Sequence, residues 1–159
     1  MKRKSSILVI FIFLLFISIS FYIFMYQNGN LPLSFYFQQK GILLKTCSTC
    51  NVINKTIYIA TSEYQLTRGM MFQSNFQGAY GMLFVMNSSQ QICMWMKNTQ
   101  IPLERIWISS SGNITYIKNA MPYDMNITCA EGKYVLETIP GNIKYGGVFY
   151  PQYLKNLTD

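Results

Sequence analysis

Hydrophobic residues form one long uninterrupted segment near the N-terminus and only short segments after it. The long segment runs from Ile7 to Tyr26 without a charged residue, and a basic cluster at residues 2–4 precedes it. Twenty helical residues extend about 30 Å, the thickness of the hydrocarbon core of a bilayer. We therefore predict that residues 1–30 form a cytoplasmic basic flank and a single transmembrane signal-anchor in the cell membrane, with the C-terminal domain outside. If this segment is instead cleaved as a signal peptide, the domain is secreted.

After residue 30, hydrophobic and polar residues alternate over short distances, a pattern typical of β-strands. Residues 31–50 are predicted to form a stalk or a first strand, and residues 51–155 one compact domain. Ser110–Asn113 carries a turn signal that predicts a hairpin. The predicted strands of the domain are Ile53–Ala60, Gly81–Met86, Ile92–Lys97, Leu103–Ser109, Ile114–Lys118, Lys133–Ile139 and Val148–Tyr150.

One short helix is predicted between the first two of these strands. Ser62 is a candidate N-cap, Glu63 is favourable in the first turn, and Gln65 completes a capping box with Ser62. The helix is expected to end at Gly69, because glycine readily adopts the conformation that terminates helices. Many short strands and one clear helix predict a compact α+β fold that is mostly antiparallel β, with partial closure into a barrel as one form of it.

Short motifs recur in a fixed order along this domain. They are Arg68–Phe72 (RGMMF), Gly81–Val85 (GMLFV), Trp95–Thr99 (WMKNT) and Tyr134–Glu137 (YVLE). Together they resemble the family called domain of unknown function 192 (DUF192) over residues 51–147. The resemblance implies a domain that is often secreted or membrane-anchored, and it implies no settled activity. Two residues depart from the family pattern: Glu104 replaces an aspartate, and Arg105 replaces an aliphatic residue. The second change predicts that the strand from Leu103 is less buried here.

Two acidic residues lie on strand faces that look apolar. Strand alternation places Glu104 on the same face as Ile106 and Ile108, and Glu137 on the same face as Val135. An unpaired buried carboxylate is costly, so each is expected to meet a cation, a hydrogen-bond donor or a water-filled cleft.

These residues and their motif neighbours predict a small polar site. Our leading hypothesis is an uncharacterised extracytoplasmic domain that recognises a small polar or saccharide ligand at the cell envelope. Trp95 would serve as a stacking platform, and the polar side chains would bind hydroxyl groups. The predicted ligand-binding residues are Arg68, Trp95, Lys97, Asn98, Thr99, Glu104 and Glu137.

Two alternatives assign these residues differently. In the structural alternative, Arg68 pairs with a carboxylate, Asn98 and Thr99 shape the following turn, and the domain packs against another envelope protein. In the enzymatic alternative, Glu104 and Glu137 act as the acid and base of a glycan hydrolase, which requires the two carboxyl groups to converge. No catalytic residue is assigned, and no cofactor is expected.

Cysteine and methionine suggest disulfides rather than metal binding. Outside the membrane, disulfides are the default for Cys93 and Cys129 within the domain and for Cys47 and Cys50 before it. The Cys47–Cys50 spacing also allows redox activity, but no helical pattern surrounds it. The many methionines alternate with Phe, Leu and Val as core residues do, so no metal site is predicted.

The overall composition excludes some functions and favours others. The chain has no histidine, which excludes Ser-His-Asp and Cys-His catalysis within one polypeptide. Part of its net charge of +7 is the basic cluster at residues 2–4, and the other basic residues are scattered without a basic-aromatic motif, so nucleic-acid binding is not expected. Five Asn-x-Ser/Thr triplets predict a glycoprotein and agree with an external location. They begin at Asn54, Asn87, Asn113, Asn126 and Asn156.

Overall fold

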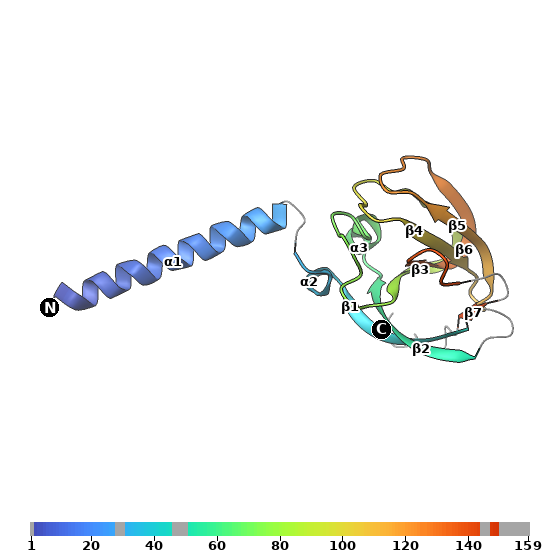
Figure 1. The fold of residues 1–159 in the computed structure, drawn as a ribbon, viewed down its shortest axis with the longest axis horizontal. Helices are drawn as coiled ribbons and strands as arrows, with labels where there is room; N and C mark the ends of the chain where they lie inside the picture. Colours follow the sequence, from blue (N-terminus) through green and yellow to red (C-terminus); the bar gives the residue numbers. More distant parts are fainter. Residues whose placement is uncertain (1, 28–30, 46–50, 144–146, 150–159) are drawn as a thin grey trace. The chain divides into compact units, whose positions relative to one another are not determined.

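The computed structural model of the chain describes residues 2–27, 31–45, 51–143 and 147–149 (Figure 1). The chain divides into two compact units, Met1–Leu31 and Pro32–Asp159. Residues 31–50, predicted as a stalk or a first strand, include a strand at Gln38–Lys45 that pairs within the same sheet as the rest of the domain.

The first unit is a single helix, α1 (Lys2–Gln27). Its described side chains, Ile10–Met25, include no charged residue. Within the part of the chain that the structure describes, no helix combines the length and the hydropathy of a membrane span. The helix itself is where the sequence predicted one, and the membrane anchor stays a prediction.

The second unit is built on a curved sheet of seven strands (Figure 1). The order of the strands across the sheet is β5-β4-β6-β3-β2-β1-β7. Strands β2 and β3 run parallel, and the other neighbouring pairs run antiparallel, so the predicted α+β fold with mostly antiparallel β is confirmed. The strands are β1 (Gln38–Lys45), β2 (Val52–Ala60), β3 (Gly81–Met94), β4 (Leu103–Ile108), β5 (Ile114–Ala120), β6 (Thr128–Thr138) and β7 (Val148–Phe149).

The two ends of the sheet come together at one point without closing it. Asn113, which precedes β5, forms an isolated antiparallel bridge with Val148 of β7. The amide of Phe149 also donates to the carbonyl of Gly112 at 2.9 Å. The sheet is therefore open, and the predicted partial closure into a barrel is corrected: the edge strands are joined by this short contact and not by a continuous ladder.

Strand β3 is longer than the sequence predicted. The segments Gly81–Met86 and Ile92–Lys97 were expected as separate strands, because the polar residues between them resemble a turn. Instead β3 continues through them, with a register irregularity between Val85 and Gln90 where it pairs with β6. The partner strand begins correspondingly early, at Thr128.

Helix α3 (Glu63–Arg68) forms as predicted in the connection between β2 and β3. The amide of Gln65 donates to Ser62 Oγ at 3.3 Å, and Gln65 Oε1 accepts from the Ser62 amide at 3.1 Å. These two bonds are the predicted capping box. The helix ends at Gly69, whose φ of +46° suits glycine, and a Cβ there would lie 3.0 Å from the Phe84 ring. A second, shorter helix, α2 (Leu33–Tyr36), precedes β1.

The sheet has two differently used faces. One face, here called the core face, carries the main aliphatic cluster, including Ile59, Leu83 and Leu136. The opposite face, here called the pocket face, carries residues that neighbour each other across β2, β3 and β6, such as Ala60, Phe84 and Val135. Gly69 at the end of α3 packs against this face through Phe84. Both faces are therefore covered, and side-chain alternation decides which environment each strand residue meets.

Candidate functional site

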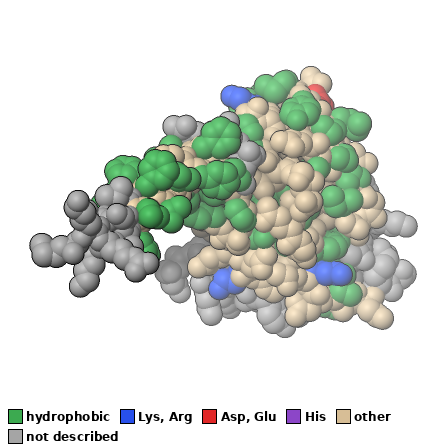
Figure 2. Space-filling view, turned by 60° about the vertical axis from the view of Figure 1, so that its left-hand side comes forward, with side chains coloured by type: hydrophobic (Ala, Val, Ile, Leu, Met, Phe, Trp, Pro, Cys, Tyr) green, Lys and Arg blue, Asp and Glu red, His purple; other side chains and the backbone are tan. Residues whose placement is uncertain are grey.

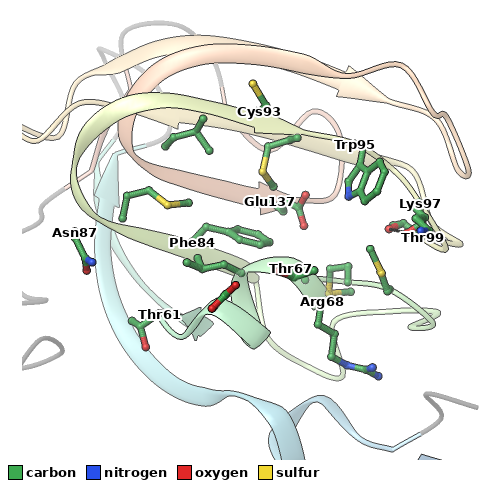
Figure 3. A pocket seen from close by; sticks show the side chains of 18 residues that line it. Thr61, Thr67, Arg68, Phe84, Asn87, Cys93, Trp95, Lys97, Thr99 and Glu137 are labelled. Atoms are coloured by element: carbon green, nitrogen blue, oxygen red, sulfur yellow. Dashed lines mark hydrogen bonds between the residues drawn. The ribbon is translucent and has the colours of Figure 1, made fainter. Parts of the chain in front are cut away.

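A pocket of about 520 Å³ lies on the pocket face of the sheet (Figure 3). Its walls come from α3, from the segment that follows α3, from β3 and the residues just after it, and from β6. The apolar lining residues are Leu66, Met70, Met71, Phe84, Met86, Ile92 and Met94, and the polar or charged ones include Thr61, Glu63, Thr67, Arg68, Asn87, Lys97, Thr99 and Glu137.

Glu137 is the most deeply buried charged side chain of this pocket. It lies on β6 opposite Met82 of β3 and Arg105 of β4, and only 3% of its surface is exposed. Within the described residues, its carboxylate has no hydrogen-bond partner. Burial raises the pKa of Glu137 to about 7, and the nearby Arg105 partly opposes this rise. The carboxyl can therefore accept or donate a hydrogen bond near neutral pH.

Arg105 lies beside Glu137 on the neighbouring strand and is almost completely buried, with 1% of its surface exposed. One nitrogen, Nη2, donates to Thr128 Oγ1 at 3.1 Å, whereas Nε and Nη1 have no hydrogen-bond partner. Burial lowers the pKa of Arg105, and the charge of Glu137 acts in the opposite direction. The expectation that Arg105 makes this strand less buried is wrong, because all six residues of β4 are buried. The β4–β6 register holds Arg105 beside Glu137 on the pocket face.

Glu104 points to the opposite face of the sheet. Its carboxylate accepts hydrogen bonds from the amides of Gly141 at 3.4 Å and Ile143 at 3.2 Å. It does not line the pocket. The prediction of Glu104 as a ligand-binding residue is therefore corrected: backbone donors of the segment after β6 occupy this carboxylate.

The hydrolase alternative fails for the same geometric reason. Glu104 pairs with Thr138, whereas the next residue, Arg105, pairs with Glu137. Adjacent positions of a strand face opposite sides of the sheet, so Glu104 and Glu137 are separated by the sheet itself. They cannot flank one glycosidic bond as an acid and a base.

Trp95 and Lys97 form one end of the pocket, with Asn87 at the other end and Glu137 between them (Figure 3). Trp95 is 39% exposed. Lys97 Nζ lies 5.0 Å from the centroid of the Trp95 ring, a distance typical of a cation–π contact. The indole thus lines the pocket while part of it remains open to solvent.

Arg68 also lines the pocket, but its guanidinium is directed away from Glu137 (Figure 3). Its Cζ atom lies 3.8 Å from the centroid of the Tyr36 ring and 5.9 Å from that of Phe72. Arg68 therefore stacks on aromatic rings beside the pocket, an arrangement that the sequence did not predict.

Asn98 and Thr99 mainly shape the turn after β3. Asn98 has a φ of +54°, a conformation that asparagine tolerates better than most residues, and its carbonyl accepts from the Phe72 amide at 2.8 Å. Thr99 Oγ1 donates to the Lys97 carbonyl at 3.3 Å. Thr99 lines the pocket and Asn98 does not. The sequence thus located five of its seven predicted ligand-binding residues in one pocket, the exceptions being Asn98 and Glu104.

The predicted disulfide between Cys93 and Cys129 is confirmed. The two cysteines are opposite each other on β3 and β6, and Cys93 lines the pocket. Cys47 and Cys50 lie outside the described residues. The side chains of four predicted glycosylation sites are exposed, namely Asn54, Asn87, Asn113 and Asn126, and Asn156 lies outside the described residues. Glycosylation itself stays a prediction.

The apolar walls were missed as site residues. Met70, Met71 and Phe84 belong to the motifs RGMMF and GMLFV, but the sequence indicated only that they are core residues. Their position in the sequence could have indicated this. The first motif follows α3 within the connection from β2 to β3, the second begins β3, and such a crossover segment packs on one face of the sheet.

Comparison with known proteins finds one family and solved structures of the same fold. The family DUF192, described as "Uncharacterized ACR", matches residues 44–149. A crystal structure from Sinorhizobium meliloti 1021, of a protein provisionally called a transcription regulator, is 27% identical with a TM-score of 0.66, and the match covers 72% of this chain and 94% of that one. A protein of unknown function from Novosphingobium aromaticivorans DSM 12444 is 26% identical with a TM-score of 0.62, over 69% and 84% of the two chains. No curated protein matches significantly.

Proposed function

Because the chain belongs to the DUF192 family, whose description names no activity, we propose a function from the geometry of the pocket. The domain binds a small polar ligand of the saccharide class at the cell envelope. Glu137 binds hydroxyl groups at the base of the pocket, and Trp95 provides a flat surface at its end.

The observation that carries this proposal is the environment of Glu137. Glu137 is only 3% exposed, and a buried carboxylate that accepts no hydrogen bond from the described residues is costly, so native proteins rarely retain one without a reason. Here the carboxylate lines a pocket of about 520 Å³, a size within the usual range for small-molecule sites. A ligand hydroxyl would supply a hydrogen bond to the Glu137 carboxylate. Ligand binding would therefore reduce the free-energy cost of burying this carboxylate.

The balance of charges favours an uncharged ligand. Arg68 and Lys97 line the pocket together with Glu63 and Glu137, and Arg105 lies beside Glu137. Neither sign dominates strongly enough to select an anion or a cation. The partly exposed Trp95 and the apolar walls suit the hydrophobic face of a sugar ring, while Glu137 suits its hydroxyl groups.

Two features support a location outside the cytoplasm. The Cys93–Cys129 disulfide is of the kind that persists in oxidising compartments. The described side chains of α1 are uncharged, and most of them are exposed. We therefore include in the proposal that α1 anchors the chain in the cell membrane and that the domain lies outside.

The test is a binding assay on the full chain in detergent with a panel of hexoses, N-acetylhexosamines and their disaccharides. Trp95 fluorescence and the unfolding temperature report binding. We expect at least one saccharide to bind to the wild type. Glu137→Gln or Trp95→Leu should weaken binding at least about tenfold, because a hydrogen bond to a charged group is replaced by one to a neutral amide, or a stacking surface is lost.

Glu131→Gln is the matched control, since Glu131 is an exposed carboxylate on the same strand outside the pocket lining. It should bind as the wild type does. Failure of every saccharide to bind, or equal binding by Glu137→Gln and the wild type, would refute the proposal and favour a domain that only contacts other envelope proteins.

A further inference from the structure

The last part of β3 and the first part of β6 form a two-stranded ribbon. Residues 90–94 pair with residues 128–132 in antiparallel register, beyond the irregularity that separates them from the main sheet. Among the described strands, no third one pairs with the ribbon, because β2 and β4 pair only with the other parts of β3 and β6. Two strands alone are marginally stable, so the position of the ribbon depends on further contacts.

Two side chains of β4 bind the ribbon to the pocket face of the sheet. Trp107 Nε1 donates to the Ile92 carbonyl at 2.9 Å in a buried hydrogen bond. Arg105, which lies beside Glu137, donates through Nη2 to Thr128 Oγ1 at 3.1 Å. Each strand of the ribbon thus has its own contact with β4, and both contacts require the two strands to stay in place.

The ribbon carries one wall of the pocket. Ile92, Cys93 and Met94 line the pocket, and Trp95 and Lys97, which follow directly in the chain, line it too. Ile92 and Met94 are buried, whereas Cys93 between them is exposed. A displacement of the ribbon would therefore move the wall that presents Trp95.

The Cys93–Cys129 disulfide joins the two strands of the ribbon to each other. Both cysteine side chains are exposed, and Figure 3 shows the Cys93 sulfur directed away from Glu137. A reductant can therefore reach the disulfide without entering the pocket, and exposed disulfides are more easily reduced than buried structural ones. Charged residues make up 12% of the chain and are sparse on the face shown in Figure 2, where a small reductant would meet little electrostatic repulsion.

We propose that the Cys93–Cys129 disulfide is a redox-sensitive lock on the pocket wall. In an oxidising compartment the disulfide persists until a dithiol reductant reaches it. Its reduction removes the covalent link within the ribbon, so the ribbon loosens together with the wall that presents Trp95. The effect on ligand affinity rests on the proposed function, whereas the loosening of the ribbon does not.

The reduction is an ordinary thiol–disulfide exchange. A thiolate of the dithiol attacks one sulfur of the pair, forms a mixed disulfide and releases the other cysteine as a thiolate. The second thiol of the reductant then displaces the cysteine that is still bound. Cys93 and Cys129 have gained two electrons and two protons as two thiols, and the reductant leaves as a disulfide.

The first experiment measures the ribbon itself, in the full chain in detergent with Cys47→Ser and Cys50→Ser, so that one pair of cysteines remains. The Trp107 indole proton is the reporter, because it donates to the Ile92 carbonyl of the ribbon. Trp95 is the only other tryptophan and serves as a reference. In ¹⁵N-labelled protein, dithiothreitol without denaturant should speed the exchange of the Trp107 proton at least about tenfold, and reoxidation should restore the slow rate.

Backbone amides of residues 81–85 and 134–138 are the internal control, because β2 and β4 support this part of the sheet. Their exchange rates should stay within about twofold. Adding Cys93→Ser and Cys129→Ser gives the matched chain, which should exchange the Trp107 proton rapidly with or without dithiothreitol. Three results would overturn the lock: a disulfide that dithiothreitol leaves intact in the folded chain, as judged by thiol alkylation and mass, an unchanged Trp107 rate after reduction, or equal acceleration of the control amides.

The second experiment measures saccharide binding in the same two redox states. A saccharide that binds the oxidised chain should bind the reduced chain at least about tenfold more weakly, because the stacking surface of Trp95 is no longer held in place. Equal affinities would show that the lock does not control the pocket. If no saccharide binds the oxidised chain, the proposed function fails, while the exchange of the Trp107 proton still decides whether the disulfide locks the ribbon.

Discussion

Two regions of the domain each contain a buried carboxylate, and the two carboxylates differ in their hydrogen-bond partners. Glu104 is 4% exposed on the core face, and Glu137 is 3% exposed on the pocket face of the neighbouring strand. Glu104 accepts two backbone hydrogen bonds, whereas Glu137 has none from the described residues and lines a pocket. Burial alone therefore does not identify a functional residue; the presence or absence of protein donors separates a structural carboxylate from a candidate binding group.

The difference follows from what packs over each face. Around Glu104, the segment after β6 turns back so that its amides at Gly141 and Ile143 point at the carboxylate. Around Glu137, the covering residues from α3 and β3 are largely apolar and leave a pocket instead of donating. One carboxylate holds a segment of the fold in place, and the other is left for a group from outside the chain.

The largest expected effect is the loss of the hydrogen bonds to Glu104. Glu104→Ala leaves two amides without an acceptor, one of them in a buried bond, so the free energy of unfolding should fall by about 4 kcal/mol. Glu104→Gln keeps one acceptor oxygen and should lose about half as much. Urea unfolding of the full chain measures both.

Glu131→Gln is the matched control for Glu104, because it changes an exposed acidic residue and should leave the free energy of unfolding within about 0.5 kcal/mol. If Glu104→Ala behaved like this control, the two buried carboxylates would not differ as described.

The elements of the fold that the sequence predicted well are those with local signals. The capping box at Ser62 and Gln65 lies within four residues, and it fixed the start of α3 correctly. The continuity of β3 was missed because its second half is stabilised by pairing with Thr128–Gly132, about 40 residues further along the chain. A polar segment within a strand then resembles a turn until its distant partner is known.

The sequence predicted the burial of the candidate site residues but not the faces of the sheet on which they lie. Strand alternation correctly indicated that Glu104 and Glu137 would both be buried. It did not indicate that they face opposite sides, because this depends on the β4–β6 register, which pairs Glu137 with Arg105. The burial of Arg105 was missed for the same reason. Contacts within a strand can be inferred from alternation, whereas contacts across a sheet need the register.

The second-largest expected effect is a pH dependence of the free energy of unfolding that arises from Glu137. Its pKa in the folded chain is about 7, above the ordinary value of 4.5. Below pH 4.5 the carboxyl is protonated in both folded and unfolded chains, and between 4.5 and 7 it is protonated mainly in the folded chain. Stability should therefore fall as the pH rises through this window, by about 3 kcal/mol relative to Glu137→Gln, and remain level above it.

Urea unfolding of the wild type and Glu137→Gln at several pH values between 4 and 8 measures this difference. Other titrating groups are common to both chains and cancel in the comparison. A difference that does not change with pH would show that Glu137 is satisfied in the folded chain, and its contrast with Glu104 would disappear.

The smallest effect tests whether Arg105 sets the charge state of Glu137. Arg105 opposes the rise of the Glu137 pKa, so Arg105→Met should raise that pKa further. Lys118→Met is the control, because Lys118 neighbours Arg105 on β5 but is exposed, and solvent screens its charge. Carboxyl ¹³C chemical shifts of glutamate-labelled protein, assigned with Glu137→Gln, give the pKa directly. Equal changes of the Glu137 pKa in the two variants would mean that this pKa responds to the net charge of the sheet and not specifically to the buried neighbour Arg105. A larger shift in Arg105→Met would show that this neighbour keeps Glu137 partly ionised near neutral pH, and so able to accept a ligand hydroxyl.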